Sequence, residues 1–416
     1  MKNLMLNLFM LLATFQIISA QHIWEEKEEF DFFLKKIELI DKDTLYVISH
    51  SSVYKSTNGA NDWEKSFQVG SGEVIVDIRF SSEAVGYILV GNNDGDSTLL
   101  YKTSNYGDDW TLKNSIDDPI FSIYSNVDFI NDTVGFISTG DNIIYRTTDG
   151  GEHLDTIYEG GQVTDIVFTS DSVAYASIRS SSWSNNVNDI FKTENQGDDW
   201  TSVYFNSTGY FPADNELILE MDFINDNIGF VVGRNNFMLR TYDGGVTWVQ
   251  LFPGEDNSVI NSIDFVSTTR GFITMDGTVH KSTNAGFSFL SENVQYFSTV
   301  HSIQMIDLDV GYGITSVPYD YDGHSIFRRK NTIGLDDVVL QEDISIYPNP
   351  TFDEINISMQ ENIDLDEIRI LSLEGRLINK IEDGVTNISL LDYPSGVYMI
   401  EFISKEGMIV KKIMKY

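Results

Sequence analysis

The sequence predicts an all-β protein, in which a seven-bladed β-propeller of four-stranded blades is followed by a small Ig-like β-sandwich. Two observations predict this fold: a turn motif that recurs through residues 56–289, and a different pattern of short alternating strands after residue 343. A composition of 42% hydrophobic and 12% aromatic residues is that of a globular protein. A ring of six blades is the alternative count.

The repeated motif begins with Ser or Thr, has Asn or Asp two residues later and usually Gly two residues further on. Its leading residues stand at positions 56, 103, 147, 193, 241 and 282, so the steps are 47, 44, 46, 48 and 41 residues. Three short apolar runs precede the motif and a fourth begins at its last, aromatic residue. Four strands per repeat make one propeller blade, which buries both faces only by stacking on its neighbours.

The motif is predicted to be a structural turn between the third and fourth strands of each blade. Its hydroxyl and its Asn or Asp oxygen can accept hydrogen bonds from backbone N–H groups, and its glycine tolerates positive φ. A motif repeated in every blade is architecture rather than a catalytic site. The residues assigned to it are Ser56, Asn58, Trp63, Thr103, Asn105, Gly107, Trp110, Thr147, Asp149, Gly151, Thr193, Asn195, Gly197, Trp200, Thr241, Asp243, Gly245, Trp248, Ser282, Asn284, Gly286 and Phe289.

This repeat resembles the Asp-box, or BNR-like repeat, of sialidase, sortilin and xyloglucanase propellers, as the segment Thr241–Trp248 illustrates. With the preceding segment Gly229–Gly233 it is most similar to the photosystem II assembly factor family of plastids and cyanobacteria. The resemblance spans about residues 22–335. It implies the propeller fold, which serves many functions.

The last blade is expected to be completed by the N-terminus of the propeller. Residues 303–306, 310–313 and 326–329 supply three strands, and no fourth strand follows before the next domain. The segment 23–27 precedes the first blade and has the character of a fourth strand. Pairing it with the last blade would close the ring and remove its exposed edges.

The C-terminal segment resembles the sorting domain of type IX (Por) secretion cargo. The residues that carry this resemblance are Tyr347, Pro348, Asn349, Pro350, Gly375, Gly396, Tyr398, Lys411 and Lys412. It implies a Bacteroidota-type cell, the type IX secretion machinery and its sorting protease as partners, and a protein released or attached at the outer cell surface. An adhesive Ig-like domain is the competing interpretation.

The N-terminus has the layout of a secretory signal peptide. Lys2 precedes an apolar stretch over residues 4–18, and Ser19 and Ala20 offer a small-residue cleavage site. The predicted organisation is a signal peptide over 1–20, an Asp-box propeller over 21–335, a linker over 336–343 and a sorting domain over 344–416. The N-terminal apolar stretch is too short and too interrupted to span a membrane, and no later apolar run is long enough to do so.

Composition narrows the classes of function. The chain has 63 acidic against 27 basic residues, a net charge of −36, and no cysteine. The negative surface argues against nucleic acid as a partner, and without cysteine there is no disulfide or thiol chemistry. The Asp94–Asp96 and Asp320–Gly323 segments are fragments of calcium loops that lack the full ligand set. No metal or cofactor is therefore predicted, and calcium binding is the alternative left open.

The predicted ligand-binding residues lie on loops that share one face of the propeller. Connections between strands two and three and between successive blades leave at the face opposite the repeated turns. Aromatic side chains there can stack on sugars or anchor a protein partner. These residues are Trp183, Tyr210, Phe211, Tyr319 and Tyr321. We expect this face to bind a glycan or a surface protein, unless the aromatic rings fold back onto their own blades.

Enzymatic activity is the alternative function, in the form of a secreted glycoside hydrolase acting on polysaccharide. Related propellers include sialidases, but the Arg-Ile-Pro signature of that family is absent. Arg146 and Arg240 precede the repeated turn, where other blades carry Lys, so they are interpreted as structural. No spacing singles out a catalytic carboxylate pair, and no catalytic residue is predicted.

Overall fold

The computed structural model describes residues 24–92, 97–117, 125–179, 188–205, 218–254, 257–292, 294, 299–316, 324–329, 344–359, 365–372, 377–382, 386–404 and 407–416. All regular elements within these ranges are β-strands, which confirms the all-β class. The predicted signal peptide lies outside the described residues.

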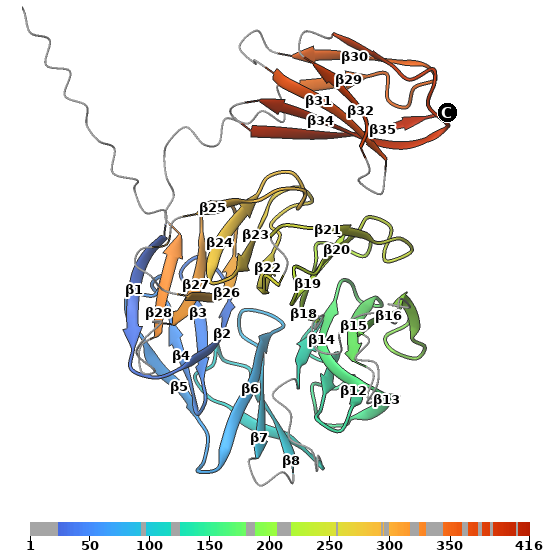
Figure 1. The fold of residues 1–416 in the computed structure, drawn as a ribbon. Helices are drawn as coiled ribbons and strands as arrows, with labels where there is room; N and C mark the ends of the chain where they lie inside the picture. Colours follow the sequence, from blue (N-terminus) through green and yellow to red (C-terminus); the bar gives the residue numbers. More distant parts are fainter. Residues whose placement is uncertain are drawn as a thin grey trace, which may run out of the picture.

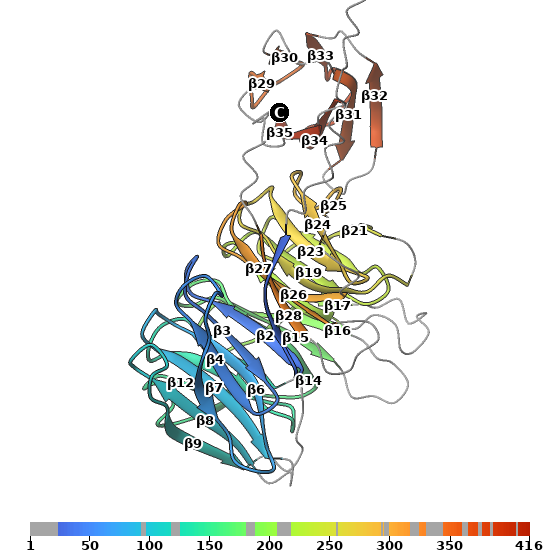
Figure 2. The ribbon, with the colours of Figure 1, turned by 90° about the vertical axis from the view of Figure 1, so that its left-hand side faces the viewer.

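Seven four-stranded antiparallel sheets correspond to the seven predicted blades (Figures 1 and 2). Blades 1 to 3 are formed by β2 (Leu34–Leu39), β3 (Leu45–Ser49), β4 (Ser52–Ser56) and β5 (Glu64–Gln68); by β6 (Glu73–Phe80), β7 (Gly86–Asn92), β8 (Ser97–Thr103) and β9 (Thr111–Asp117); and by β10 (Val127–Phe129), β11 (Gly135–Ser138), β12 (Ile143–Thr147) and β13 (Asp155–Glu159). Blades 4 to 6 are formed by β14 (Gln162–Phe168), β15 (Ala174–Arg179), β16 (Asn188–Thr193) and β17 (Thr201–Phe205); by β18 (Ile218–Phe223), β19 (Gly229–Gly233), β20 (Met238–Thr241) and β21 (Val249–Leu251); and by β22 (Ile260–Asp264), β23 (Gly271–Met275), β24 (Thr278–Ser282) and β25 (Leu290–Glu292).

Blade 7 joins the two ends of the propeller. It contains β26 (Thr299–Met305), β27 (Gly311–Ser316), β28 (His324–Arg329) and, as its outer strand, β1 (Trp24–Phe30). β1 pairs antiparallel with β28, from Trp24 opposite Arg329 to Phe30 opposite His324. The N-terminal strand therefore completes the last blade, as predicted, and the edge of β28 is paired rather than exposed.

The first strand of each blade lies innermost, against the first strands of its neighbours (Figure 1). Six of these seven strands carry a one-residue register shift at the same place, as between Ile75 and Asp77 in β6 and between Ile218 and Glu220 in β18. Because a bulge changes which side chains face each side of a strand, this repeated shift sets the residues that point to the propeller axis.

Neighbouring blades are packed together by a repeated pair of aromatic rings. A ring from the second strand of one blade lies on a ring at the end of the first strand of the next blade, or one residue beyond it. The centroids are 3.9 Å apart for Tyr175 and Phe223 and 3.7 Å apart for Phe230 and Phe265. A glycine before the second-strand ring makes room for this packing. At Gly229, an added Cβ would lie 2.3 Å from the Phe223 ring.

The C-terminal residues form two sheets that share one core. One sheet has the order β29 (Ile344–Tyr347), β30 (Glu354–Met359), β33 (Asn387–Ser389); the other has the order β32 (Leu377–Glu382), β31 (Leu365–Ser372), β34 (Gly396–Ser404), β35 (Gly407–Lys415). Ile355 and Ile388 of the first sheet pack with Ile370, Ile400 and Phe402 of the second. Figure 2 shows the two layers, which form the predicted small sandwich.

Several sorting-domain residues tie the sandwich together. Tyr347-Pro348 and Asn349-Pro350 are cis peptide bonds, and Asn349 bonds the backbone of β35 at the Lys412 carbonyl oxygen (2.7 Å) and the Met414 N–H (3.0 Å). The Tyr398 hydroxyl donates to the Pro394 carbonyl oxygen at 2.6 Å. Gly375 lies outside the described residues.

Candidate functional site

All five predicted ligand-binding aromatics lie outside the described residues. They are Trp183, Tyr210, Phe211, Tyr319 and Tyr321. Their assignment to a binding face remains a prediction. The described residues do show what occupies the repeated turns, the propeller axis and the remaining loops.

The repeated turns have the same hydrogen bonds in all six copies. In blade 5 the Thr241 hydroxyl accepts the Gly245 N–H at 2.8 Å and donates to Asp243 Oδ1 at 3.0 Å, and Asp243 Oδ1 accepts the Thr247 N–H at 2.8 Å. The fifth residue has a positive φ in each copy, +86° at Gly245 and +64° at Ala60, which replaces the glycine in blade 1. These side chains are engaged within the turn, which they hold in a left-handed conformation.

In four of the six copies the basic residue before the turn bonds the next blade; these residues are Lys55, Lys102, Arg146 and Arg240. Lys55 pairs with Asp108 at 2.8 Å, and Arg146 pairs with Asp198 at 2.6 Å. Arg240, which is fully buried, donates to the carbonyl oxygens of Ala285 (2.5 Å) and Thr268 (3.1 Å). Arg146 and Arg240, which the sequence analysis interprets as structural, therefore both bind the neighbouring blade.

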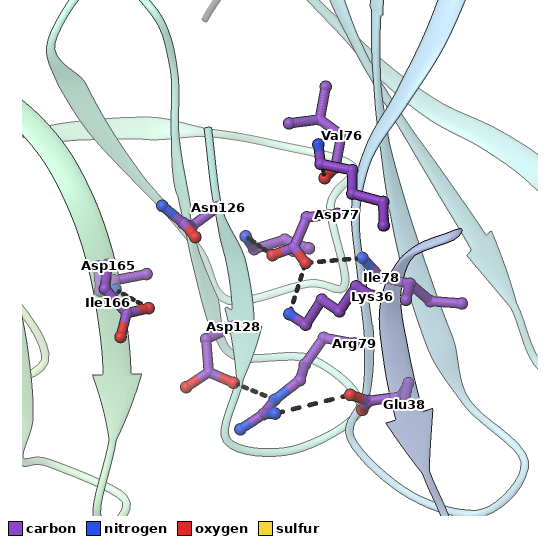
Figure 3. Close-up of polar contacts among 12 residues, drawn as sticks. Lys36, Glu38, Val76, Asp77, Ile78, Arg79, Asn126, Asp128, Asp165 and Ile166 are labelled. Atoms are coloured by element: carbon purple, nitrogen blue, oxygen red, sulfur yellow. Dashed lines mark hydrogen bonds and ion pairs between the residues drawn. The ribbon is translucent and has the colours of Figure 1, made fainter. Parts of the chain in front are cut away.

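A second set of contacts joins the blades at the axis (Figure 3). Lys36 Nζ lies 2.6 Å from Asp77 Oδ1, and Arg79 lies between Asp128 (2.9 Å) and Glu38 (3.7 Å). Asp77, Glu38 and Asp128 are buried. We call this group, with the further side chains given next, the axial cluster.

The axial side chains accept backbone N–H groups from the next blade at all seven junctions. These bonds run from Phe80 to Glu38, Val127 to Asp77, Phe168 to Asp128, Met221 to Asp165, Ile263 to Glu220, Phe265 to Asp222, Met305 to Asp264 and Leu39 to Gln304, at 2.6–3.0 Å. They satisfy donors that strand bulges and blade boundaries leave without a sheet partner.

The charge of the axial cluster is uneven. Lys36 and Arg79 lie with the carboxylates of blades 1 to 3, whereas no ion pair within the described residues neutralises those of blades 4 to 6. Burial raises the pKa of Glu220 to about 8 and that of Asp165 to about 7, and the nearby Asp165 carboxylate adds to the increase at Glu220. Burial likewise raises the pKa of Asp222 to about 6. These carboxyls are therefore partly protonated near neutral pH.

The face opposite the repeated turns, here called the loop face, carries two exposed aromatic rings among the described residues. Phe33 follows β1 and is 53% exposed; Phe252 follows β21 and is 69% exposed. Both lie in connections between successive blades. The opposite, turn face carries Tyr106, in the turn between β8 and β9, at 51% exposure.

The sequence analysis missed Phe33 because this residue belongs to a segment rich in phenylalanine, which is typical of a buried core. Phe30 and Phe32 do pack with Tyr54 and Trp63 in the cluster between blades 7 and 1. Phe33 instead meets two imidazoles, with its ring centroid 4.7 Å from that of His324 and 5.9 Å from that of His301. No local signal separates Phe33 from these core neighbours, because residues 31–33 lie between β1 and β2 and do not follow strand alternation.

The described residues contain neither a metal-binding cluster nor a membrane-spanning helix. No group of three or more His, Asp or Glu side chains there is arranged to hold a metal ion. No helix in the described part of the chain is long and apolar enough to cross a membrane.

Comparison with known families identifies two segments. Residues 345–416 match the secretion system C-terminal sorting domain, and residues 207–289 match photosynthesis system II assembly factor YCF48. The chain thus combines a propeller with YCF48-like repeats and a type IX sorting domain. This domain marks the protein for type IX export, and so for secretion or attachment to the cell surface.

Short segments are similar to curated proteins. The photosystem II assembly lipoprotein Ycf48 of Prochlorococcus marinus strain NATL2A is 44% identical over 50 residues, which is 11% of this chain and 15% of that protein. That of strain MIT 9312 is 35% identical over 69 residues, 16% of this chain and 18% of that protein. The match therefore spans less than a fifth of the length of these relatives.

Solved structures share the fold. YCF48 bound to D1 peptide superposes with a TM-score of 0.58 at 14% identity, covering 74% of this chain and 97% of that one. The GH74 enzyme of Niastella koreensis gives 0.54 at 12% identity, covering 94% and 74%. The GH74 xyloglucanase of Xanthomonas campestris gives 0.57 at 11% identity, covering 88% and 59%. At these identities the likeness concerns the fold alone.

Proposed function

We propose that this protein is an exported propeller whose loop face binds a glycan or a protein ligand outside the cell. The sorting domain supplies the export. The observation that carries the binding role is the pair of exposed rings, Phe33 and Phe252, in blade-to-blade connections of one face. An exposed aromatic ring offers a large apolar surface with little conformational freedom to lose on binding.

The polar side chains of the repeated turns and of the axial cluster support a loop-face site, because they hydrogen-bond within the propeller itself. The repeated turns bond their own backbone, as Thr241 does, and four of the preceding basic residues bond the next blade, as Arg240 does. The axial carboxylates accept backbone N–H groups. Binding residues are therefore expected on the loop face, where the five aromatics Trp183, Tyr210, Phe211, Tyr319 and Tyr321 are also predicted.

Proteins of similar fold are associated with both ligand classes, which supports testing both. One of the solved neighbours holds a peptide and another is a xyloglucanase. We therefore propose to screen the full chain against immobilised polysaccharides, including xyloglucan, and against proteins of its own cell surface. The double variant Phe33→Ala/Phe252→Ala should lose binding. Tyr106→Ala, with a ring of similar exposure on the turn face, should retain it; equal loss in both would refute a loop-face site.

Hydrolysis is the second candidate function. The raised pKa of Glu220, about 8, would keep a carboxylic acid protonated at neutral pH, as a general acid requires. Its Oε2 accepts the Ile263 N–H at 3.0 Å, which ties it to the blade junction. Reducing-sugar release from a bound polysaccharide that is abolished by Glu220→Gln would favour a hydrolase over a binding protein.

A further inference from the structure

We propose that Phe33, His301 and His324 form a subsite for an uncharged sugar ring, on the loop face where blades 7 and 1 meet. This inference rests on the proposed function and names its ligand class. The three side chains come from the connection between β1 and β2, from β26 and from β28.

Phe33 supplies the surface on which a sugar would lie. Its ring is 53% exposed, whereas Phe30, three residues earlier, is buried against Trp63. Leu34, the next residue, is fully buried and fixes the backbone on the other side. Phe33 is thus an exposed ring on a short connection held at both ends, and its apolar face can pack against the C–H face of a pyranose.

His301 lies against one side of the Phe33 ring and is held there by the backbone. Its ring stacks on Phe33 with an interplanar angle of 11°, and its Nε2 lies 3.1 Å from the Leu34 carbonyl oxygen. A carbonyl oxygen only accepts, so Nε2 carries the hydrogen. The imidazole also hydrogen-bonds the Thr299 backbone, so the backbone holds this ring in place and its contribution to the subsite is the ring stacked beside Phe33.

His324 supplies an unsatisfied polar atom. It is 4% exposed and stands edge-on to Phe33 at 74°, and its Nδ1 has no hydrogen-bond partner among the described residues. Buried polar atoms are rarely left without a partner, so this nitrogen calls for a ligand or water hydroxyl. Phe33, whose ring centroid is 4.7 Å from that of His324, is the exposed ring beside it.

The surroundings favour an uncharged ligand. Burial lowers the pKa of both His301 and His324, which keeps the imidazoles neutral at pH 7. The neighbouring cation Lys36 is paired with Asp77, and Lys35 donates to the Val76 carbonyl oxygen at 2.6 Å. With a net charge of −36, the molecule repels acidic polysaccharides, and an apolar peptide anchor would leave the His324 nitrogen unsatisfied.

Affinity electrophoresis of the full chain tests this subsite, with neutral β-glucan and mannan and with alginate as the acidic probe. We expect retardation by a neutral polysaccharide only. Phe33→Ala should weaken it at least tenfold, Phe33→Trp should preserve it, and His324→Ala should weaken it severalfold. Tyr106→Ala is the matched control with unchanged binding, and thermal unfolding of each variant checks its folding.

Each other outcome overturns the subsite. Neutral polysaccharide bound equally by Phe33→Ala would refute it while leaving the proposed function intact. Binding of alginate alone, or of a protein alone, would refute the ligand class. Failure of the wild-type chain to bind any polysaccharide or surface protein would overturn both this inference and the proposed function.

Discussion

Removing the Glu292 carboxylate should destabilise the propeller where its two ends meet. Glu292 ends blade 6, and it accepts the Trp24 indole N–H at 2.9 Å from β1, the N-terminal strand. Arg329, at the end of β28, donates to both its oxygens at 2.8 and 3.0 Å. All three side chains are buried, so one carboxylate binds both ends of the propeller chain.

The magnitude follows from that burial. Glu292→Ala leaves a buried guanidinium without its bidentate partner, which costs about 3–5 kcal/mol, and also removes the acceptor of the indole N–H. This is a large share of the roughly 5–15 kcal/mol by which a domain is ordinarily stable. At about 2–4 °C per kcal/mol, this corresponds to a decrease in Tm of about 6–20 °C.

Chemical denaturation followed by tryptophan fluorescence measures this loss. The double variant Glu292→Leu/Arg329→Met is the control, because replacing both ions by apolar residues removes the unpaired charge and should recover most of the stability. A loss below about 1 kcal/mol in Glu292→Ala would refute the closure argument. So would a double variant as unstable as the single one.

Three further predictions concern the blade junctions and turns. Burial raises the folded-state pKa of Glu220 to about 8 and that of Asp165 to about 7, above the ordinary carboxyl values of the unfolded chain. The folded protein therefore holds protons that the unfolded chain has lost, and stability should fall as pH rises from about 4.5, where the unfolded carboxyls ionise, to about 8. Glu220→Gln should flatten this dependence in a series of thermal melts and add about 1–2 kcal/mol at pH 8. Gly229→Ala should lower Tm by several degrees, about 2–4 °C per kcal/mol, because its Cβ would overlap Phe223, and an unchanged melt would contradict the packing described. Thr241→Val should cost about 1–3 kcal/mol in denaturant titrations, since the Gly245 N–H loses its acceptor, whereas Val246→Thr at the exposed position of the same turn should be neutral.

The repeat made the fold predictable because its signals are local. A hydroxyl, an Asn or Asp and a glycine close each turn through bonds between residues at most four apart, so every copy can be recognised alone. The ring closure by β1 followed from counting strands. The bond between Trp24 and Glu292 did not, because 268 residues separate them and no local pattern relates them.

The axial cluster could not be predicted from an acidic composition. Among 63 acidic residues, Glu220 and Asp222 resemble ordinary solvent-facing side chains. What distinguishes them is their two-residue spacing just before the Phe that ends the first strand, a pattern repeated by Lys36 and Glu38 before Leu39. Strand alternation places such pairs on one side, but the bulge that turns them to the axis depends on tertiary packing.

One part of the candidate site could be predicted from the sequence and another part could not. Topology placed the blade-to-blade loops on one face, and the aromatic loops predicted there remain a prediction. Phe33 was missed because its neighbours Phe30 and Phe32 are core residues. Its partners His301 and His324 are distant in sequence, so only the three-dimensional arrangement brings an exposed ring and an unsatisfied imidazole together.

Amide hydrogen exchange with and without the bound polysaccharide tests the central claim most directly, namely that the loop face binds and the turn face is architecture. Protection should increase in the blade connections 30–34 and 249–254, and remain unchanged in the turns 103–110 and 241–248. Protection confined to the turns, or to the sorting domain over 344–416, would contradict the account.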